Sequence, residues 1–181
     1  MTTKSEIVFL CTGNAARSVM ATIMFRDRCD VFVVRGAGTH VVEGHPMSVR
    51  TRTALARLGV ADPTHRSAQL WEPDATRADL IVAMAPEHVQ WVRRTMPQAA
   101  ARTGTLKRLV RDLPGAPGNA SFAARIAALD LANVEPEPWE EVVDPAAGEQ
   151  DVFDACAAEL DGLVDALIAA LCGSDYQSSS R

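Results

Sequence analysis

Apolar residues fall into short continuous runs and into longer stretches with helical spacing, and the two kinds of segment alternate along the chain. A short apolar run is typical of a buried parallel strand, because helices cover both faces of such a sheet. An amphipathic stretch is typical of a helix with one face on the core. The runs predict four strands, at residues 7–10, 31–34, 78–84 and 105–109. The amphipathic stretches predict helices at residues 17–28, 49–58, 87–94, 122–131 and 152–171.

Strands that alternate with helices favour a single-domain, three-layer α/β/α fold around a central four-stranded parallel sheet. The length of 181 residues suits one domain and is enough to bury a core. We expect this domain to span residues 1–172. The polar residues 173–181 are typical of a disordered tail.

Local signals at the helix ends support these boundaries. Ser48, Ser121 and Asp151 each precede a predicted helix, and their side chains are expected to cap it. Gly59 is expected to end the second helix, because glycine readily takes the left-handed conformation found there. Pro86 suits the first turn of the third helix.

The loop between the first strand and the first helix has the composition of an anion-binding site. It reads Cys11-Thr12-Gly13-Asn14-Ala15-Ala16-Arg17-Ser18. Ligands of open α/β sheets bind at the carboxyl ends of the strands, where this loop lies. Gly13 permits backbone angles that other residues avoid. Loop amides and the positive end of the next helix can then surround an oxyanion.

Cys11 at the end of the strand is the candidate nucleophile. The loop amides, the helix N-terminus and Arg17 all favour its thiolate over its thiol. The Arg17 guanidinium can bind two phosphate oxygens, Ser18 can hydrogen-bond the sulfur, and Asn14 can tie the loop to its neighbours. A lone cysteine at a strand end is more often a core residue. The combination of Cys, Gly, Asn, Arg and Ser at this spacing favours the catalytic interpretation.

A cysteine, five residues and then Arg-Ser near the N-terminus resemble the phosphate-binding loop of the low-molecular-weight protein tyrosine phosphatase family. Thioredoxin-coupled arsenate reductases share that fold and loop. The resemblance covers about residues 6–171, and it implies the strand order 2-1-3-4. Residues 112–140 are longer than the corresponding interval of the family, which implies an insertion beside the active site.

The family resemblance also implies the reaction and the residues that perform it. A cysteine-dependent phosphatase would hydrolyse phosphate monoesters, protein phosphotyrosine above all, through a phosphocysteine intermediate. Cys11 and Arg17 would be catalytic. The phosphate group of the substrate would be bound by Thr12, Gly13, Asn14, Ala15, Ala16 and Ser18. Inorganic phosphate or sulfate would occupy the same loop.

The general acid of the family is the aspartate of an Asp-Pro pair before the last helix, and Asp144-Pro145 stands at that position. Proline would stiffen the loop that carries the acid. Asp62-Pro63 has the same dipeptide at a different place in the chain. The position relative to the last helix therefore favours Asp144 as the acid. His65 lies in a segment that resembles the family, and both a solvated loop residue and a catalytic residue fit this pattern.

Three departures from the family bear on the substrate. Ala16 replaces the second cysteine of the loop, so Cys29 or an external thiol would have to protect an oxidised Cys11. Ala146-Ala147 replaces the aromatic residues that flank a phosphotyrosine ring, and Ala15 replaces a threonine of arginine-phosphate phosphatases. Specificity for tyrosine therefore comes from the resemblance and not from these residues. Trp139 or Phe122 of the insertion is expected to supply the missing wall, and the alternative for Trp139 is that it packs the insertion on the body of the domain.

Composition and charge exclude several other classes of protein. A net charge of −5 provides no basic surplus for nucleic acid or for an anionic membrane. No apolar run is long enough to span a bilayer, and the first residues lack a secretory signal. We therefore expect a cytoplasmic protein whose partner is a phosphorylated protein or a small phosphate monoester.

The other cysteines do not suggest a metal site or a disulfide scaffold. Cys29, Cys156 and Cys172 form no Cys-x-x-Cys pair, and no histidine stands at ligand spacing from them. They are interpreted as packing residues. We expect neither a metal nor a cofactor.

Two other functions are compatible with this loop. Arsenate resembles phosphate, so an arsenate reductase or arsenate-thiol transferase that uses an external low-molecular-weight thiol is the main alternative. The thioredoxin-coupled version needs further cysteines in the middle of the chain, and none occurs between Cys29 and Cys156. A non-catalytic phosphate-binding module is the third hypothesis, which the presence of Cys11, Arg17 and Asp144 disfavours.

Overall fold

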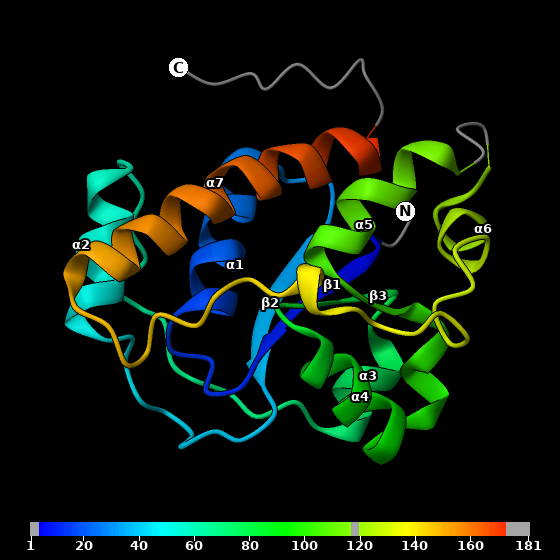
Figure 1. Cartoon of the computed structure of the whole chain (residues 1–181), viewed down its shortest axis with the longest axis horizontal. Helices are drawn as coiled ribbons and strands as arrows, with labels where there is room; N and C mark the ends of the chain where they lie inside the picture. The colour runs from blue at the N-terminus through cyan, green and yellow to red at the C-terminus, as the bar shows by residue number, and fades with distance from the viewer. Residues whose placement is uncertain (1–3, 117–119, 173–181) are drawn as a thin grey trace.

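The computed structural model describes residues 4–116 and 120–172, which form a three-layer α/β/α arrangement (Figure 1). One sheet of four strands has the order β2-β1-β3-β4, and each pair of neighbours is parallel. The predicted class and strand order are therefore confirmed. The strands are β1 (Glu6–Cys11), β2 (Val33–Gly38), β3 (Leu80–Ala83) and β4 (Thr103–Thr105).

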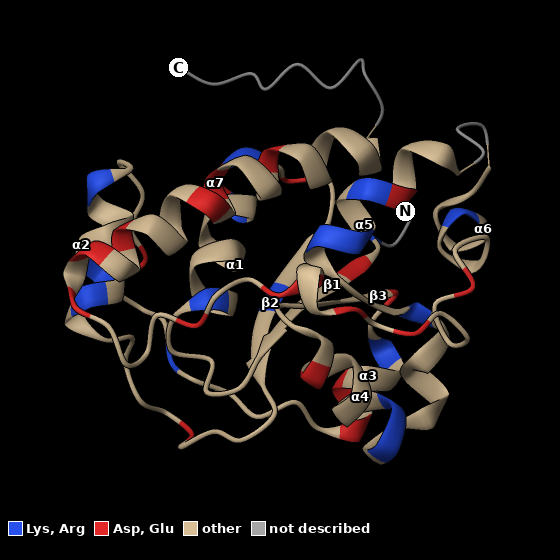
Figure 2. Cartoon of the chain, in the orientation of Figure 1, with Lys and Arg blue, Asp and Glu red and all other residues tan. Residues whose placement is uncertain are grey.

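Helices cover both faces of this sheet (Figure 1). The α-helices are α1 (Arg17–Arg28), α2 (Val49–Arg57), α3 (Glu72–Arg77), α4 (Pro86–Thr95), α5 (Leu106–Asp112), α6 (Phe122–Ala127) and α7 (Gln150–Cys172). Three short 3₁₀ segments are η1 (Pro97–Arg102), η2 (Leu113–Gly115) and η3 (Pro138–Glu140). Helices α1, α2 and α5 pack against α7 on one side, and α3 and α4 lie on the other. Basic and acidic residues are interspersed along the helices (Figure 2).

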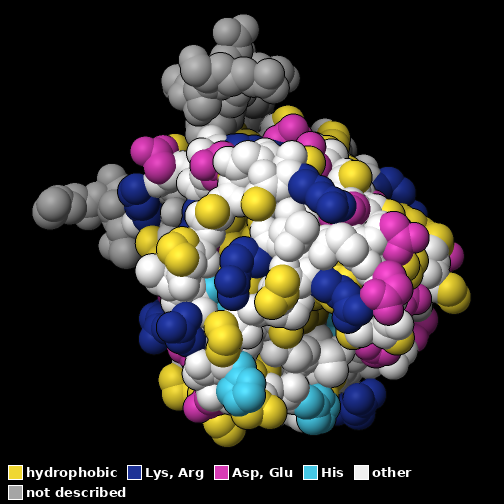
Figure 3. All heavy atoms as spheres, turned by 90° about the vertical axis from the view of Figure 1, so that its left-hand side faces the viewer, with side chains coloured by type: hydrophobic (Ala, Val, Ile, Leu, Met, Phe, Trp, Pro, Cys, Tyr) yellow, Lys and Arg dark blue, Asp and Glu magenta, His cyan; other side chains and the backbone are white. Residues whose placement is uncertain are grey.

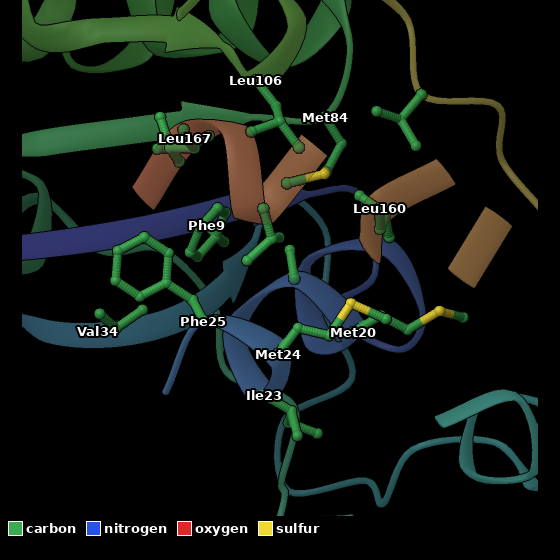
Figure 4. Packing of buried hydrophobic residues seen from close by; sticks show 14 of the residues in the cluster. Phe9, Met20, Ile23, Met24, Phe25, Val34, Met84, Leu106, Leu160 and Leu167 are labelled. Carbon is green, nitrogen blue, oxygen red and sulfur yellow. The ribbon is translucent and has the colours of Figure 1, made fainter. Parts of the chain in front are cut away.

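Strand β1 divides its side chains between the two cores. Ile7 and Phe9 face the larger core under α1 and α7, whereas Val8 and Leu10 face the smaller core under α3 and α4. This is the period-2 alternation of a strand buried on both faces. In the larger core the rings of Phe9 and Phe25 lie next to each other, with centroids 5.7 Å apart (Figure 4). Strand β1 is therefore held by apolar packing on both faces of the sheet.

Most of the predicted helix ends are confirmed. Ser48 and Ser121 accept a hydrogen bond from the backbone N–H three residues later. Gly59 follows α2 with a φ of 78°, the left-handed conformation that favours glycine. Asp151 lies inside the first turn of α7, which begins at Gln150, so its prediction as the cap was wrong.

The predicted position of the fourth strand, residues 105–109, was wrong. Strand β4 ends at Thr105, and α5 begins at the next residue. The Thr105 hydroxyl accepts a hydrogen bond from the N–H of Arg108, as an N-cap does. Leu106, Leu109 and Leu113 are all fully buried, and their spacing of three and four residues is helical. Apolar runs this short do not separate strand from helix by pattern alone.

Other elements also differ in extent from the sequence predictions. Strand β2 runs from Val33 to Gly38, so it begins two residues later and ends four residues later than its apolar run. Helix α6 ends at Ala127, and Asp130 then takes a φ of 49°. Helix α3 was not predicted. Within residues 4–116 and 120–172, no helix is long and apolar enough to cross a membrane. The assignment of residues 112–140 as an insertion stays a prediction, and the tail lies outside the described residues.

Candidate active site

The loop from Cys11 to Arg17 lies directly against the carboxyl end of β2. The N–H of Thr39 donates to the Cys11 carbonyl at 2.9 Å, and the N–H of His40 donates to the Thr12 carbonyl at 3.0 Å. Asn14 takes the left-handed conformation with a φ of 48°, whereas Gly13, the residue expected to need unusual angles, does not. Asparagine tolerates this conformation because its short side chain forms local hydrogen bonds.

Asn14 connects the loop to the segment around His65. Its carbonyl accepts hydrogen bonds from His65 Nε2 at 3.1 Å and from Ser67 Oγ at 2.8 Å, and its side-chain Oδ1 accepts from the N–H of Ala68 at 3.0 Å. A carbonyl can only accept, so His65 carries its proton on Nε2. Burial lowers the pKa of His65, which keeps the ring neutral. His65 thus lies behind the loop and supports it through this hydrogen bond to Asn14.

Cys11 forms the floor of the site, and Ser18 lies directly behind it. The Cys11 side chain is buried, and its sulfur lies 2.9 Å from Ser18 Oγ. Asn14 Nδ2 donates to the same Oγ at 2.9 Å. Because that oxygen accepts from Asn14, its single proton is free to point at the sulfur. Ser18 is therefore oriented as a hydrogen-bond donor to a Cys11 thiolate.

Arg17 and Asp144 lie 127 positions apart in the sequence and form an ion pair at the mouth of the site. Arg17 Nη2 is 2.5 Å from Asp144 Oδ2, and Arg17 Nη1 donates to the Val142 carbonyl at 3.2 Å. Arg17 is buried, whereas 43% of the Asp144 side chain is exposed. Asp62 lies elsewhere, where it caps Thr64 and pairs with Arg26. The structure thus brings Cys11, Arg17 and Asp144 together and leaves Asp62 apart.

A hollow of about 260 Å³ opens above the Cys11 sulfur. Its lining residues are Cys11, Thr12, Gly13, Ala15, Ala16, Arg17, Asp144 and Ala146. Asn14 and Ser18 are fully buried behind it, so they shape the loop and do not line the hollow. Hydrophobic, basic, acidic and histidine side chains are mixed on the face of the molecule seen in Figure 3.

The described residues that line this hollow include no aromatic side chain. Trp139 lies against Arg111, whose guanidinium is 4.6 Å from the ring centroid. Phe122 packs on Phe32 with a centroid distance of 5.5 Å. The hypothesis that Trp139 or Phe122 supplies a wall for the substrate was therefore wrong, and the packing alternative describes Trp139.

Gly38 makes the close approach of β2 to the loop possible. A Cβ added there would lie 2.5 Å from the Thr12 carbonyl oxygen and 3.0 Å from the Asn14 nitrogen, both of them backbone atoms. We expect Gly38→Ala to displace the loop and to lower kcat/KM for p-nitrophenyl phosphate by about tenfold or more, since overpacking costs roughly 1–3 kcal/mol. At Gly162 an added Cβ meets nothing within 4 Å among the described residues apart from its chain neighbours and the nearby backbone of its own helix, so Gly162→Ala is the control. Equal activity in both variants would contradict this role for Gly38.

His88 is a buried residue of the site that the sequence analysis missed. Its Nε2 lies 3.0 Å from Thr12 Oγ1, and only 1% of the residue is exposed. Within the described parts of the chain its Nδ1 has no hydrogen-bond partner. Burial, and then the charge of Arg17, lower the pKa of His88 to about 3. The ring is neutral at pH 7 and orients the Thr12 hydroxyl at the edge of the hollow.

The neutral state of His88 predicts a loss of stability in acid. Between pH 6.5 and about 3 the unfolded chain binds a proton at His88 that the folded chain does not. The free energy of unfolding should therefore fall by roughly 1.4 kcal/mol per pH unit in this window from His88 alone. Urea titrations of His88→Gln should show a shallower fall, whereas the exposed His45→Gln should keep the original slope. An unchanged slope in His88→Gln would count against a buried neutral ring.

Comparisons with known proteins agree with this geometry. The model of the family described as low molecular weight phosphotyrosine protein phosphatase matches residues 6–116. A protein-arginine-phosphatase of Geobacillus stearothermophilus is 29% identical over 163 residues, which cover 90% of this chain and 93% of that protein. A low molecular weight protein-tyrosine-phosphatase of Streptomyces coelicolor is 30% identical over 175 residues, which cover 92% and 93% of the two chains.

A solved structure extends the likeness to the whole fold. The arginine phosphatase YwlE of Geobacillus stearothermophilus superposes with a TM-score of 0.76 at 27% identity, and the match covers 98% of this chain and 99% of YwlE. These relatives support a cysteine-based phosphatase and do not favour the arsenate reductase alternative. The chain belongs to the low molecular weight phosphotyrosine protein phosphatase family.

Proposed function

We propose that this protein is a phosphatase that uses Cys11 to hydrolyse phosphate monoesters through a phosphocysteine intermediate. The observation that carries the proposal is the arrangement of one hollow, with the Cys11 sulfur at its floor and the Arg17–Asp144 pair at its mouth. A nucleophile, a cation for the phosphate oxygens and an acid for the leaving group are the parts that this reaction needs.

In the first step the Cys11 thiolate attacks phosphorus in line with the leaving oxygen. The S–P bond forms, the P–O bond breaks, and Asp144 in its protonated state gives its proton to the leaving oxygen. Arg17 binds the equatorial oxygens of the phosphate. Since Arg17 Nη2 contacts Asp144 Oδ2, phosphate binding to Arg17 frees that oxygen for the leaving group.

In the second step water attacks the phosphocysteine and Asp144, now a carboxylate, accepts a proton from it. The S–P bond breaks and inorganic phosphate leaves. The Ser18 hydroxyl, 2.9 Å from the sulfur, stabilises the departing thiolate by a hydrogen bond. Water is the only co-substrate of the two steps.

Protein phosphotyrosine is the first candidate substrate, in keeping with the family. Protein phosphoarginine is the second, and two observations favour it. The described lining of the hollow offers no ring to flank a phenol, and one relative matched along most of both chains is a protein-arginine-phosphatase. For phosphoarginine the bond that breaks is P–N, and Asp144 would protonate nitrogen.

A substrate panel tests the function and separates the candidates. Phosphate release would be measured from p-nitrophenyl phosphate and from peptides that carry phosphotyrosine, phosphoarginine or phosphoserine. We expect turnover of p-nitrophenyl phosphate and of the phosphotyrosine or phosphoarginine peptide, and the higher kcat/KM identifies the substrate. Failure with every phosphorylated compound, together with thiol-dependent arsenite formation from arsenate, would overturn the proposal.

A further inference from the structure

A buried ion pair holds the segment that leads to Asp144. Glu140 lies in η3 and is 1% exposed, and the Arg108 side chain of α5 is 8% exposed. Arg108 Nε donates to Glu140 Oε1 at 3.0 Å, and Arg108 Nη2 contacts the same oxygen. A carboxylate and a guanidinium are rarely buried this deeply unless they are paired.

Two further donors complete the environment of the Glu140 carboxylate. The hydroxyl of Thr105, at the end of β4, donates to Oε2, and the N–H of Glu137 donates to Oε1 at 2.7 Å. Burial alone would raise the pKa of Glu140, but the hydrogen bonds from Arg108, Thr105 and Glu137 outweigh it and hold the pKa below its ordinary value. The carboxylate therefore joins three elements, the end of β4, helix α5 and the turn η3.

The chain after Glu140 is fixed as far as Val142 and then emerges into solvent. The N–H of Val142 donates to the Met84 carbonyl at 2.8 Å, just beyond the end of β3, and its own carbonyl accepts from Arg17. Val142 is fully buried, whereas Val143 is 61% exposed and the Asp144 side chain is 43% exposed. Asp144 thus extends from a rigid anchor only four residues away.

The ion pair on the other side of Asp144 is the weaker of the two. Arg50 of α2 pairs with Glu149 at 2.6 Å, but 45% and 84% of the two side chains are exposed. Exposed pairs of this kind contribute about 0–1 kcal/mol, because water screens them and the side chains lose entropy. Removing one partner of a buried pair costs more, because it leaves the other charge uncompensated. Pro145, next to Asp144, is also buried, so the buried ion pair at Glu140 is the charged contact that holds this segment away from solvent.

We propose that Glu140 and Arg108 are positioning residues whose buried ion pair sets the place of Asp144 relative to Cys11. The inference rests on the proposed role of Asp144 as the acid. Neither residue lines the hollow, so both act through the backbone of residues 140–144. A shift of the acid by about 1 Å is enough to lower a rate up to 10²-fold.

The dependence on the leaving group separates positioning from a purely structural role. A phosphatase with a misplaced acid loses most rate on esters of poor leaving groups, because these need the proton. A destabilised but otherwise intact enzyme loses rate equally on all esters. The measurement is kcat/KM, which covers the steps up to phosphocysteine, for phenyl phosphate and for p-nitrophenyl phosphate.

Glu140→Gln is the test variant, since it keeps the shape and removes the charge. We expect its kcat/KM for phenyl phosphate to fall at least tenfold further than that for p-nitrophenyl phosphate. Glu141→Gln makes the same chemical change at the next residue, whose side chain is exposed, and should leave both values unchanged. Arg108→Lys keeps the charge but loses the two-nitrogen contact, and it should change the ratio of the two kcat/KM values in the same direction. It serves as the test variant if Glu140→Gln does not fold.

Equal losses on the two esters, in variants that melt as folded proteins, would overturn the positioning role. A wild-type protein that turns over neither ester would instead reject the proposed function. If Asp144→Ala shows no dependence on the leaving group, the acid itself is misassigned. If Asp144→Ala shows that dependence and both Glu140→Gln and Arg108→Lys do not, only the inference on the ion pair fails.

Discussion

Replacing Cys11 by serine is expected to reduce the hydrolysis of p-nitrophenyl phosphate to the level of a blank. A serine hydroxyl holds its proton far more tightly than a thiol does. The variant therefore lacks the anion that attacks phosphorus, and the loss should be on the order of 10³-fold or more. Steady-state release of p-nitrophenolate at saturating substrate measures this.

The other thiols provide the control for Cys11→Ser. The half-buried Cys172 is near Cys29, with their sulfurs 4.0 Å apart, and it does not line the hollow. Cys172→Ser should therefore keep wild-type turnover. Full activity in Cys11→Ser would refute the phosphocysteine scheme, whatever Cys172→Ser does.

Asp144→Ala is expected to lose about 10²–10⁴-fold in kcat/KM on phenyl phosphate and much less on p-nitrophenyl phosphate, as removal of a general acid does. Nitrophenolate leaves readily as an anion, whereas phenolate needs the proton. The second Asp-Pro pair offers a matched control, because Asp62 carries the same side chain before a proline and lies away from the hollow. Asp62→Ala should keep both rates.

The Arg17–Asp144 contact adds a second expectation for this variant. Loss of the carboxylate also removes the oxygen that Arg17 Nη2 contacts at 2.5 Å. Inorganic phosphate should then bind Asp144→Ala at least as tightly as the wild type, since no carboxylate competes for the guanidinium. Equal losses on both esters, with weaker inhibition by phosphate, would show that Asp144 only supports Arg17.

The parts of the fold and site that depend on local pattern could be predicted. Helix α1 has the predicted bounds because its apolar face is continuous and the loop before it is distinctive. The phosphatase class followed from the resemblance of the loop from Cys11 to Ser18 to that of the family. Helix α5 was missed because a short run of leucines fits both structures, and α3 was missed because its six residues, Glu72–Arg77, have almost no apolar face.

The supporting residues could not be predicted, since their partners are remote in sequence. His88 reaches Thr12 across 76 positions, and Glu140 reaches Arg108 across 32. Nothing in the sequence around His88 or Glu140 indicates that either residue is buried. The left-handed angle of Asn14 was missed because glycine, the residue most able to take it, stands next to it.

The way Asn14 is held has a thermodynamic consequence for ligand binding. The groups that satisfy it, at His65, Ser67 and Ala68, all lie behind the loop and none of them belongs to a ligand. The entropy of arranging the loop is therefore lost once, when the chain folds, and not at each encounter with a substrate. With the loop preorganised in this way, the main rearrangement that an arriving oxyanion must drive is at Arg17, which exchanges Asp144 for the oxyanion.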